Sequence, residues 1–325
     1  MKILILGGTI LVGRHIAEAA LDAGHNITLF NRGQTNTHLF PNVEKLRGDR
    51  DGGLAALRDR SWDVVVDVNG YVPRHVYDSA SLLKDRVGQY IYVSTGAVYQ
   101  TPFPINGDES HAVRRIEDET NEDTNTYYGE LKYLCERRAE EAMPGRTLVC
   151  RLGLVAGRYD DSDRATYWVV RASQGGTMVV PGKPDDAFQV IHGRDFGNFI
   201  VRAAEQNLTG VYNTTGEVIT WGQWVETAKA VGEADTTFVW IDDREFLERH
   251  VGAGWRHFPL YLPPDWGAWW TNNSDKAQAL GLTYRPTEDI VRDILDWYAT
   301  LPDDYMMRVG LSLEQEQTLL THWQA

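Results

Sequence analysis

The first 150 residues alternate short apolar, β-branched runs with segments of helical periodicity. The apolar runs read KILILG, NITLF, VEKLRG, DVVVDV, QYIYVS and RTLVCR. This alternation is typical of βαβ units, in which helices cover both faces of a parallel sheet. Helices are expected over residues 12–23 and 127–143, where Gly24 and Pro144 supply the stop signals. With right-handed crossovers, the pattern predicts an α/β fold built on a doubly wound parallel sheet, a Rossmann sheet.

A glycine cluster, GGTILVG, lies between the first apolar run and the first predicted helix. Gly7 permits a tight turn, Gly8 lets the backbone approach a phosphate, and Gly13 lets the helix pack closely on the sheet. Ile10 stands where the usual fingerprint has its middle glycine, so phosphate approach relies on Gly8 and Thr9. The cluster predicts a dinucleotide site, although a turn without a ligand would also use such glycines. The expected contacts are Gly7, Gly8, Thr9, Ile10, Leu11, Val12 and Gly13.

The second apolar run ends in Asn31 and Arg32, where many dinucleotide sites carry an acidic residue for the adenosine 2′-hydroxyl. A guanidinium pairs with a 2′-phosphate, and the missing carboxylate removes repulsion against it. Arg32 therefore favours NADP(H), while NAD stays open because an arginine here also stacks on adenine or faces water. Asp49, after the third run, is a candidate acceptor for the adenine amino group or a simple strand terminator.

Three residues farther along the chain, Thr95, Tyr128 and Lys132, predict chemistry at a carbon that bears oxygen. Tyr128 and Lys132 are four apart on a predicted helix and therefore share a face. The lysine charge, with that of an oxidised nicotinamide, lowers the pKa of a tyrosine, so that a phenol can work as a general base near neutrality. Thr95 ends the fifth run, at the sheet edge where ligands bind. A YxxxK spacing is common by chance, so the prediction depends on its combination with the glycine cluster.

These features resemble the extended short-chain dehydrogenase/reductase superfamily, in its NAD(P)-dependent epimerase/dehydratase family. The similarity runs through GGTILVG, YVSTGAVY, YGELK, RLGLVAGR, FQVIHGRDF and SDKAQALGLTYRPTEDI. GGT with NRG is also similar to the branch of isoflavone-reductase-like and chloroplast stem-loop-binding proteins. The resemblance implies that Thr95 orients the substrate, with Ser94 beside it at the cofactor, and that Tyr128 is the acid/base. Lys132 would bind the nicotinamide ribose, whereas Tyr127 has Leu131 four residues on.

The chain departs from parts of this pattern. Gly96 and Ala97 stand where related sugar-nucleotide dehydratases carry an Asp-Glu pair for elimination, which disfavours a standard 4,6-dehydration. The arginine that often clamps a nucleotide diphosphate is missing before SDKA, and Arg164 is one of the arginines that could compensate. His192 lies in a region that helps close the site in relatives, although a structural hydrogen bond also explains it. The candidate substrate contacts are Thr95, Gly96, Arg164, His192 and Trp269.

Beyond Arg151 the strand and helix rhythm loosens, which predicts a second, smaller lobe of mixed structure. We expect the nucleotide-binding domain over residues 1–160, completed by about 187–216, the substrate lobe over 161–186 and 217–300, and a C-terminal helical tail over 301–325. The Trp-rich segment 254–270 could form a pocket wall for a ring-shaped substrate. The alternative is a structural role, as packed core of the small lobe or as a dimer contact. Asp160, Asp161 and Asp163 are interpreted as solvated rather than metal-binding.

Composition narrows the classes of partner. A net charge of −14 argues against a nucleic-acid partner, because affinity for phosphate backbones comes from Lys and Arg. No apolar run approaches the length of a membrane span, and MKILILGG leads into a strand, so a cytoplasmic location without membrane contact is expected. Cys135 and Cys150 are the only cysteines, which makes a disulfide framework or a thiolate metal cluster implausible, and no metal site is expected. The expected partner is a small sugar or nucleoside-like substrate, bound by a monomer or homodimer.

Three functions compete. The first is an enzyme that oxidises a secondary hydroxyl to a transient ketone, after which epimerisation or elimination precedes hydride return. The second is a net NADPH-dependent reductase of a ketone or enone, for which Arg32 is the main support. The third is a non-catalytic dinucleotide-sensing or RNA-associated protein, which the intact Thr95, Tyr128 and Lys132 set and the net charge of −14 disfavour.

Overall fold

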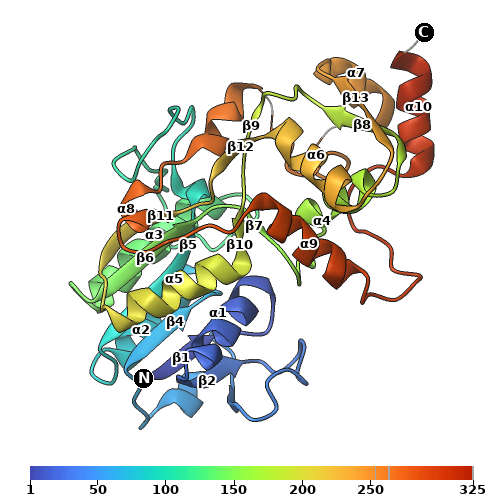
Figure 1. Cartoon of the computed structure of the whole chain (residues 1–325). Coiled ribbons are helices and arrows are strands. Elements are labelled where there is room, and N and C mark those ends of the chain that lie inside the picture. Colours follow the sequence, from blue (N-terminus) through green and yellow to red (C-terminus); the bar gives the residue numbers. More distant parts are fainter. Residues whose placement is uncertain (253, 263, 324–325) are drawn as a thin grey trace. The chain divides into compact units, whose positions relative to one another are not determined.

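The computed structural model describes residues 1–252, 254–262 and 264–323, which form two compact units (Figure 1). The first unit comprises Met1–Leu154, Gly193–Gly216 and Asn272–Thr283, and the second comprises Val155–His192, Glu217–Thr271 and Tyr284–Ala325. Residues 272–283 were expected in the substrate lobe, and the structure assigns them to the first unit. The reason is hydrogen bonding, since Thr215 Oγ1 donates to the carbonyl of Asn272 at 3.2 Å and the Asn273 N–H donates to the carbonyl of Gly107 at 2.9 Å.

The first unit contains a seven-stranded parallel sheet in the order β11-β6-β5-β4-β1-β2-β3. Six strands coincide with the six apolar runs and the seventh returns from beyond residue 187, so the predicted doubly wound sheet is confirmed. The strand order reverses between β1 and β4, and in such sheets ligands bind beside this point at the carboxyl ends of the strands. The strands are β1 Lys2–Leu6, β2 Asn26–Asn31, β3 Glu44–Arg47, β4 Val64–Asp67, β5 Gln89–Thr95, β6 Thr147–Leu152 and β11 Gly210–Thr214.

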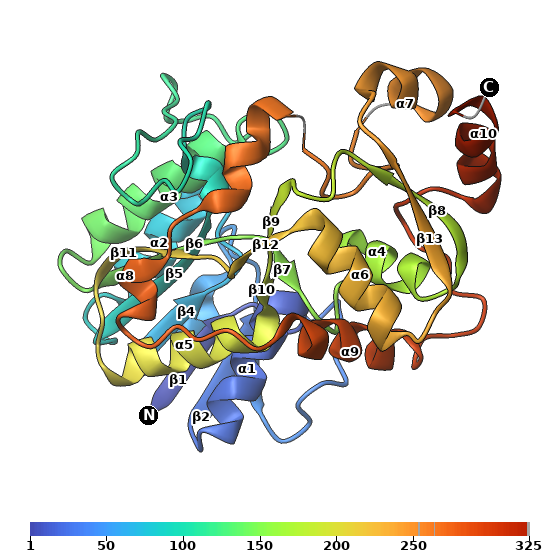
Figure 2. The same cartoon turned by 45° about the horizontal axis from the view of Figure 1, so that its top comes forward.

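Helices cover both faces of this sheet: α1 packs with α5 on one face and α2 with α3 on the other (Figure 2). The core between the sheet and the α2 and α3 pair is apolar and includes Leu4, Val65 and Cys135, each fully buried. Gly24, with a φ of +77°, follows α1 as predicted. The helical elements are α1 Leu11–Asp22, α2 Pro73–Leu83, α3 Tyr128–Ala142, α5 Gly193–Glu205, α8 Asp275–Gln278 and the 3-10 turns η1 Leu54–Leu57 and η2 Gly96–Val98.

The second unit packs α4, α6 and α9 against one another and carries three short two-stranded sheets. Its core is aromatic: the Phe188 ring lies 4.4 Å from that of Trp221 and 5.3 Å from that of Trp270, and Trp168 lies 5.0 Å from Trp221. The elements are α4 Arg164–Ala172, α6 Trp221–Val231, α7 Arg244–Val251, η3 Pro264–Thr271, α9 Thr287–Tyr298, α10 Leu313–Trp323, β7 Val155–Ala156, β8 Gly176–Pro181, β9 Ala187–Gln189, β10 Ile191–His192, β12 Val218–Thr220 and β13 Thr236–Ile241.

A buried ion pair joins the C-terminal helix α10 to helix α4 of the second unit. Arg171 Nη2 lies 2.6 Å from Glu316 Oε2, and both side chains are at most 10% exposed. Glu316 also accepts a hydrogen bond from the backbone N–H of Val179 at 2.9 Å. The predicted helical tail therefore ends in a helix that packs on this unit through Glu316, Leu319 and Leu320.

Two of the three aspartates before α4 are not solvated, which corrects the interpretation from sequence. Asp160 is buried, accepts hydrogen bonds from Ser162 and Ala165, and has a pKa raised by burial. Asp163 is also buried and accepts hydrogen bonds from Tyr305 and Arg308. These carboxylates shape the turn before α4, and only Asp161 is exposed. None of the described helices is both long enough and apolar enough to pass through a bilayer.

Candidate active site

The glycine turn after β1 has the conformation that its sequence predicts. Gly7 and Gly8 have φ values of +117° and +95°, which side-chain-bearing residues rarely adopt. A Cβ on Gly13 would lie 2.8 Å from the Gly8 nitrogen, so α1 approaches the turn as closely as its backbone allows. A Cβ on Gly7 would lie 2.5 Å from Val68, which places the loops after β1 and β4 against each other at the switch point. This cradle fits a dinucleotide pyrophosphate at the N-terminus of α1.

Replacing Gly13 by Ala is expected to push α1 away from the turn, because the new methyl group meets backbone rather than a movable side chain. We expect a stability loss of about 1–3 kcal/mol from overpacking, together with weaker dinucleotide binding. Fluorescence titration with NADPH and urea unfolding measure the two effects. Gly24→Ala also costs stability, because Gly24 has a φ of +77°, but its methyl group meets nothing within 4 Å, so dinucleotide affinity should stay at the wild-type value. Unchanged affinity in Gly13→Ala would contradict this role of the turn.

Of the candidate cofactor residues at the ends of β2 and β3, one stabilises the glycine turn and the other two are exposed. The Asn31 amide donates to the carbonyl of Gly7 at 3.1 Å and accepts from the Gly33 N–H at 2.9 Å, so it braces the turn. Arg32 and Asp49 are exposed, and Asp49 accepts a hydrogen bond from the N–H of Asp51 at 3.0 Å. Arg47, at the end of β3, packs beside this turn, with its Nε 2.9 Å from the position of a Cβ on Gly33.

Thr95 ends β5 at the carboxyl edge of the sheet, as predicted. Its Oγ1 accepts a hydrogen bond from the N–H of Ala97 at 3.2 Å and so caps η2, which contains the buried Gly96. Ser94 was expected at the cofactor, but its buried hydroxyl donates to Glu136 at 2.5 Å. In this structure the Ser94 side chain belongs to a buried network, in which Arg151 pairs with Glu136 at 2.8 Å.

Tyr128 begins α3, and Lys132 follows one turn later on the same helix. The Tyr128 side chain is 38% exposed, whereas Lys132 is only 3% exposed. Lys132 Nζ donates to the carbonyl oxygens of Gly70 at 2.9 Å and Val93 at 2.7 Å. Burial lowers the pKa of Lys132 to about 8, against the opposing effect of nearby groups that include Asp67. In general, the positive charge of a lysine one helical turn away favours the phenolate form of a tyrosine.

The loop between β4 and α2 also reaches this pair, although sequence reasoning did not include it in the site. The Tyr71 ring lies 6.4 Å from the ring of Tyr128, and Lys132 Nζ lies 5.3 Å from the centre of the Tyr71 ring. A second ring, that of Tyr92, lies 4.3 Å from Nζ. The Asn-Gly step in DVNGYVP, directly after a buried strand, is the signal that could have pointed to this loop.

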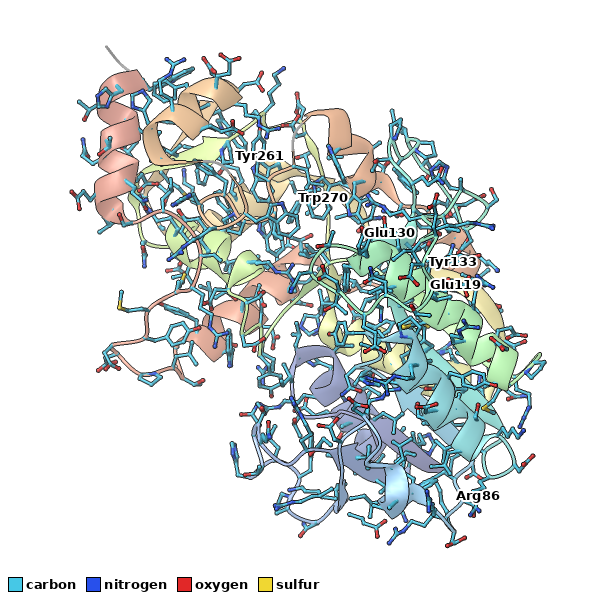
Figure 3. The ribbon with its side chains drawn as sticks, turned by 180° about the vertical axis from the view of Figure 1, so that it is seen from behind. Arg86, Glu119, Glu130, Tyr133, Tyr261 and Trp270 are labelled. Atoms are coloured by element: carbon cyan, nitrogen blue, oxygen red, sulfur yellow. The ribbon has the colours of Figure 1, made fainter. Side chains whose placement is uncertain are left out.

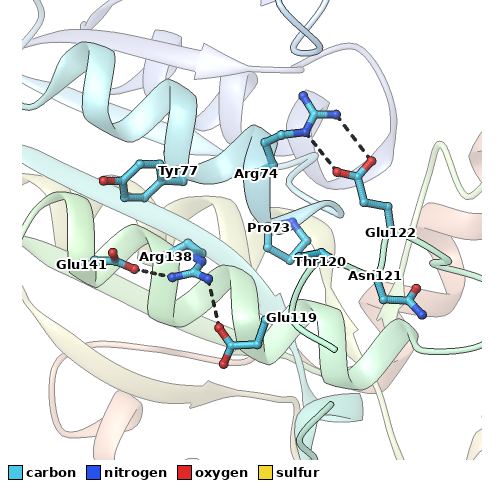
Figure 4. Close-up of a pocket in the computed structure, with 9 residues that line it drawn as sticks. All are labelled: Pro73, Arg74, Tyr77, Glu119, Thr120, Asn121, Glu122, Arg138 and Glu141. Carbon is cyan, nitrogen blue, oxygen red and sulfur yellow. Dashed lines mark hydrogen bonds and ion pairs between the residues drawn. The ribbon is translucent and has the colours of Figure 1, made fainter. Parts of the chain in front are cut away.

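The segment that leads into Tyr128 borders a cavity of about 450 Å³ between α2 and α3 (Figure 4). Two arginines on its walls are engaged by carboxylates. Arg74 on α2 lies 3.0 Å from Glu122, and Arg138 on α3 lies 2.9 Å from Glu119. These pairs tie the segment to both helices at its entry into α3.

The other candidate substrate residues, Arg164, His192 and Trp269, belong to the second unit. Arg164 Nε donates to Ser162 Oγ at 2.9 Å. His192 is buried, and its Nε2 lies 2.9 Å from Asp293, which also binds Arg158 at 2.6 Å. Burial would raise the pKa of Asp293, but the hydrogen bonds from His192 and Arg158 hold it well below the usual range. A role for these residues in substrate binding stays a prediction.

The Trp-rich segment divides between a core and a cavity. Trp270, which is labelled in Figure 3, is buried in the aromatic core, whereas Trp255 and Trp266 are each 40% exposed. The cavity measures about 440 Å³, and its aromatic walls are Trp255, Phe258, Tyr261 and Trp266. Across residues 1–252, 254–262 and 264–323, no group of three or more His, Cys, Asp or Glu side chains is placed to hold a metal ion.

Known proteins resemble this chain in sequence or in fold. A family model described as the NAD dependent epimerase/dehydratase family matches residues 3–215. The chloroplast stem-loop binding protein of 41 kDa b from Arabidopsis thaliana is 32% identical over 114 residues, which is 30% of this chain and 30% of that protein. The match thus spans less than a third of this curated relative.

Solved structures share the fold at low sequence identity. UDP-N-acetylglucosamine 4-epimerase from Bacillus cereus is 14% identical, with a TM-score of 0.69 over 94% of this chain and 99% of that one. A human epimerase family protein solved with NADPH is 19% identical, with a TM-score of 0.61 over 91% of this chain and 99% of that one.

Proposed function

Because the chain belongs to the NAD dependent epimerase/dehydratase family, we propose that it oxidises a secondary hydroxyl of a sugar, nucleoside or sugar nucleotide to a transient ketone. Epimerisation or elimination at the neighbouring carbon then precedes return of the hydride. The observation that carries this proposal is the buried Lys132 ammonium one helical turn from a half-exposed Tyr128.

Each site residue has a defined task in this proposal. The charge of Lys132 stabilises the phenolate form of Tyr128, which accepts the proton of the substrate hydroxyl and becomes the neutral phenol. Thr95 holds the substrate oxygen through its hydroxyl. Gly7, Gly8 and Gly13 would hold the dinucleotide pyrophosphate at the N-terminus of α1, and Lys132 would face the nicotinamide ribose. When bound, the nicotinamide supplies a reversible hydride acceptor.

A ketone at one carbon makes the hydrogen on the neighbouring carbon acidic, so a single oxidation permits either stereochemical inversion or loss of a leaving group. Gly96 and Ala97 leave no acid pair after Thr95, which favours epimerisation over a standard 4,6-dehydration. Incubation with a panel of UDP-sugars, followed by NMR of the product, tests the proposal. An epimer formed with no net change in nicotinamide supports it, and net consumption of NADPH with a reduced product contradicts it.

Arg32 supports a preference for NADP(H) over NAD(H), because it is exposed at the end of β2 with no carboxylate in the adjoining NRG turn. Replacing Arg32 by Ala should weaken NADPH binding about tenfold and leave NADH binding nearly unchanged, since only NADPH carries the 2′-phosphate. Equilibrium titration of both cofactors measures the ratio. Arg58→Ala, at another exposed arginine of the same unit, should leave both affinities unchanged. Equal losses for the two cofactors would refute a role in 2′-phosphate binding.

Net reduction of a ketone or enone by NADPH is a second candidate, favoured by the same Arg32. It predicts stoichiometric loss of reduced-nicotinamide absorbance with candidate ketones, whereas a redox-neutral epimerase shows none. A third candidate comes from the stem-loop-binding name of the Arabidopsis relative. RNA that remains bound to the purified protein, with turnover unaffected by Tyr128→Phe, would favour that third reading.

A further inference from the structure

The loop over residues 68–72 contacts both members of the Tyr128 and Lys132 pair. The carbonyl of Gly70 accepts a hydrogen bond from Lys132 Nζ at 2.9 Å. The next residue, Tyr71, has its ring 5.3 Å from the same Nζ and 6.4 Å from the ring of Tyr128. One short loop thus supplies an acceptor for the lysine and an aromatic surface beside both residues.

The ammonium of Lys132 is enclosed by carbonyl oxygens and aromatic rings. Besides Gly70, the carbonyl of Val93 accepts a hydrogen bond at 2.7 Å, so two of the three ammonium hydrogens are engaged. The rings of Tyr71 and Tyr92 approach Nζ to 5.3 and 4.3 Å, distances at which aromatic faces attract a cation. Tyr92 is fully buried, whereas Tyr71 is 47% exposed. Tyr71 is therefore the ring of this enclosure that water reaches.

The position of the loop is fixed by two buried side chains, those of Tyr92 and Arg50. The Tyr92 hydroxyl donates to the same Gly70 carbonyl at 2.7 Å. Arg50 holds Asp67 through two hydrogen bonds, of 2.6 and 2.7 Å, and reaches Asn69 at 3.1 Å. A Cβ on Gly70 would lie 2.7 Å from Tyr92, so the loop packs there without room for a side chain. Tyr71 is thus presented from a rigid support.

We propose that Tyr71 is a positioning residue whose ring shields the Lys132 ammonium from water and keeps it and the Tyr128 ring in place, with no requirement for the Tyr71 hydroxyl. This inference rests on the proposed function of Tyr128 as proton acceptor. Removal of the ring lets water reach the ammonium and so relieves the burial that lowers the pKa of Lys132. The other groups that act on Lys132 are Asp67, Glu136, Arg50 and the Cys135 thiol, none of which the substitution changes.

Tyr71→Leu and Tyr71→Phe separate the ring from the hydroxyl. Lysine labelled with ¹³C at Cε reports ionisation of each side-chain amine by NMR, and the Lys132→Met spectrum assigns the Lys132 signal. In Tyr71→Leu, Lys132 should bind its proton about tenfold more tightly, so that its titration moves to higher pH. In Tyr71→Phe the titration should match wild type. Tyr77→Leu, which removes another half-exposed ring on α2, is the matched control and should also match wild type.

An unchanged Lys132 titration in Tyr71→Leu, or an equal shift in Tyr71→Phe, would overturn the proposal. The titration needs neither substrate nor cofactor, so its outcome is independent of whether the enzyme is an epimerase. If Tyr71→Leu shifts the titration while neither NADPH nor NADH binds the protein, the inference about Tyr71 stands and the proposed function fails. Thermal unfolding of each variant shows whether a shift arises from loss of the fold.

Discussion

Replacing Tyr128 by Phe is expected to lower turnover of the substrate by about 10²- to 10⁴-fold, the usual contribution of a positioned general acid or base. The substitution removes only the hydroxyl that accepts the substrate proton. The ring stays beside Tyr71, and Lys132 keeps its carbonyl partners Gly70 and Val93. Cofactor affinity and thermal stability should therefore stay near the wild-type values, and the loss should fall on kcat rather than on KM. Steady-state kinetics with the substrate found by NMR measures it.

The neighbouring Tyr127 offers a matched control. It is 37% exposed, against 38% for Tyr128, and it lies directly before α3. Tyr127→Phe should leave kcat unchanged, because its partner four residues on is Leu131 rather than a lysine. Equal losses in the two variants, or full activity of Tyr128→Phe, would remove Tyr128 from the mechanism.

Replacing Asp67 by Asn is expected to destabilise the first unit by about 3–5 kcal/mol, because it leaves the Arg50 guanidinium buried without its charged partner. The two side chains are 8% and 0% exposed and lie 2.6 Å apart. Asp67 also accepts a hydrogen bond from the Tyr90 hydroxyl at 2.7 Å, so the substitution disturbs a connected network. Urea unfolding followed by circular dichroism gives the change in the free energy of unfolding.

An exposed ion pair of the same unit supplies the comparison. Arg60 and Glu44 lie 2.7 Å apart, as close as the buried pair, but their side chains are 42% and 50% exposed. Glu44→Gln should change stability by at most about 1 kcal/mol, because water screens this pair. A loss of at most about 1 kcal/mol for Asp67→Asn as well would contradict this account. The buried Arg50 and Asp67 pair would then not hold the loop after β4.

Periodicity and spacing were enough to predict the sheet and the main pair of site residues. Each of the six apolar runs forms a strand. Runs of β-branched residues that alternate with helical segments favour a parallel sheet, because the helices can then cover both faces of that sheet. Tyr128 and Lys132 were found because their spacing matches one helical turn. Both signals are local in the chain and need no knowledge of distant contacts.

The parts that sequence reasoning missed depend on contacts between distant segments. Lys132 meets Gly70 across 62 positions of the chain, and this contact follows from the pairing of β4 with β5, which no local pattern encodes. The two buried aspartates before α4 show the same limit. Asp160 accepts hydrogen bonds from its neighbours Ser162 and Ala165, whereas Asp163 accepts one from Tyr305, far along the chain. From sequence alone, polar residues in a loop-like stretch are predicted to be solvated, because the distant residues that bury them are not known.

Equilibrium titration of the purified protein with NADPH and NADH tests the central claim most directly, because every proposed step depends on a nicotinamide held at the glycine turn. The account predicts saturable binding at a single site, tighter for NADPH, and clearly weakened in Gly13→Ala but not in Gly24→Ala. Absence of saturable binding of either cofactor, or equal binding by wild type and Gly13→Ala, would contradict it.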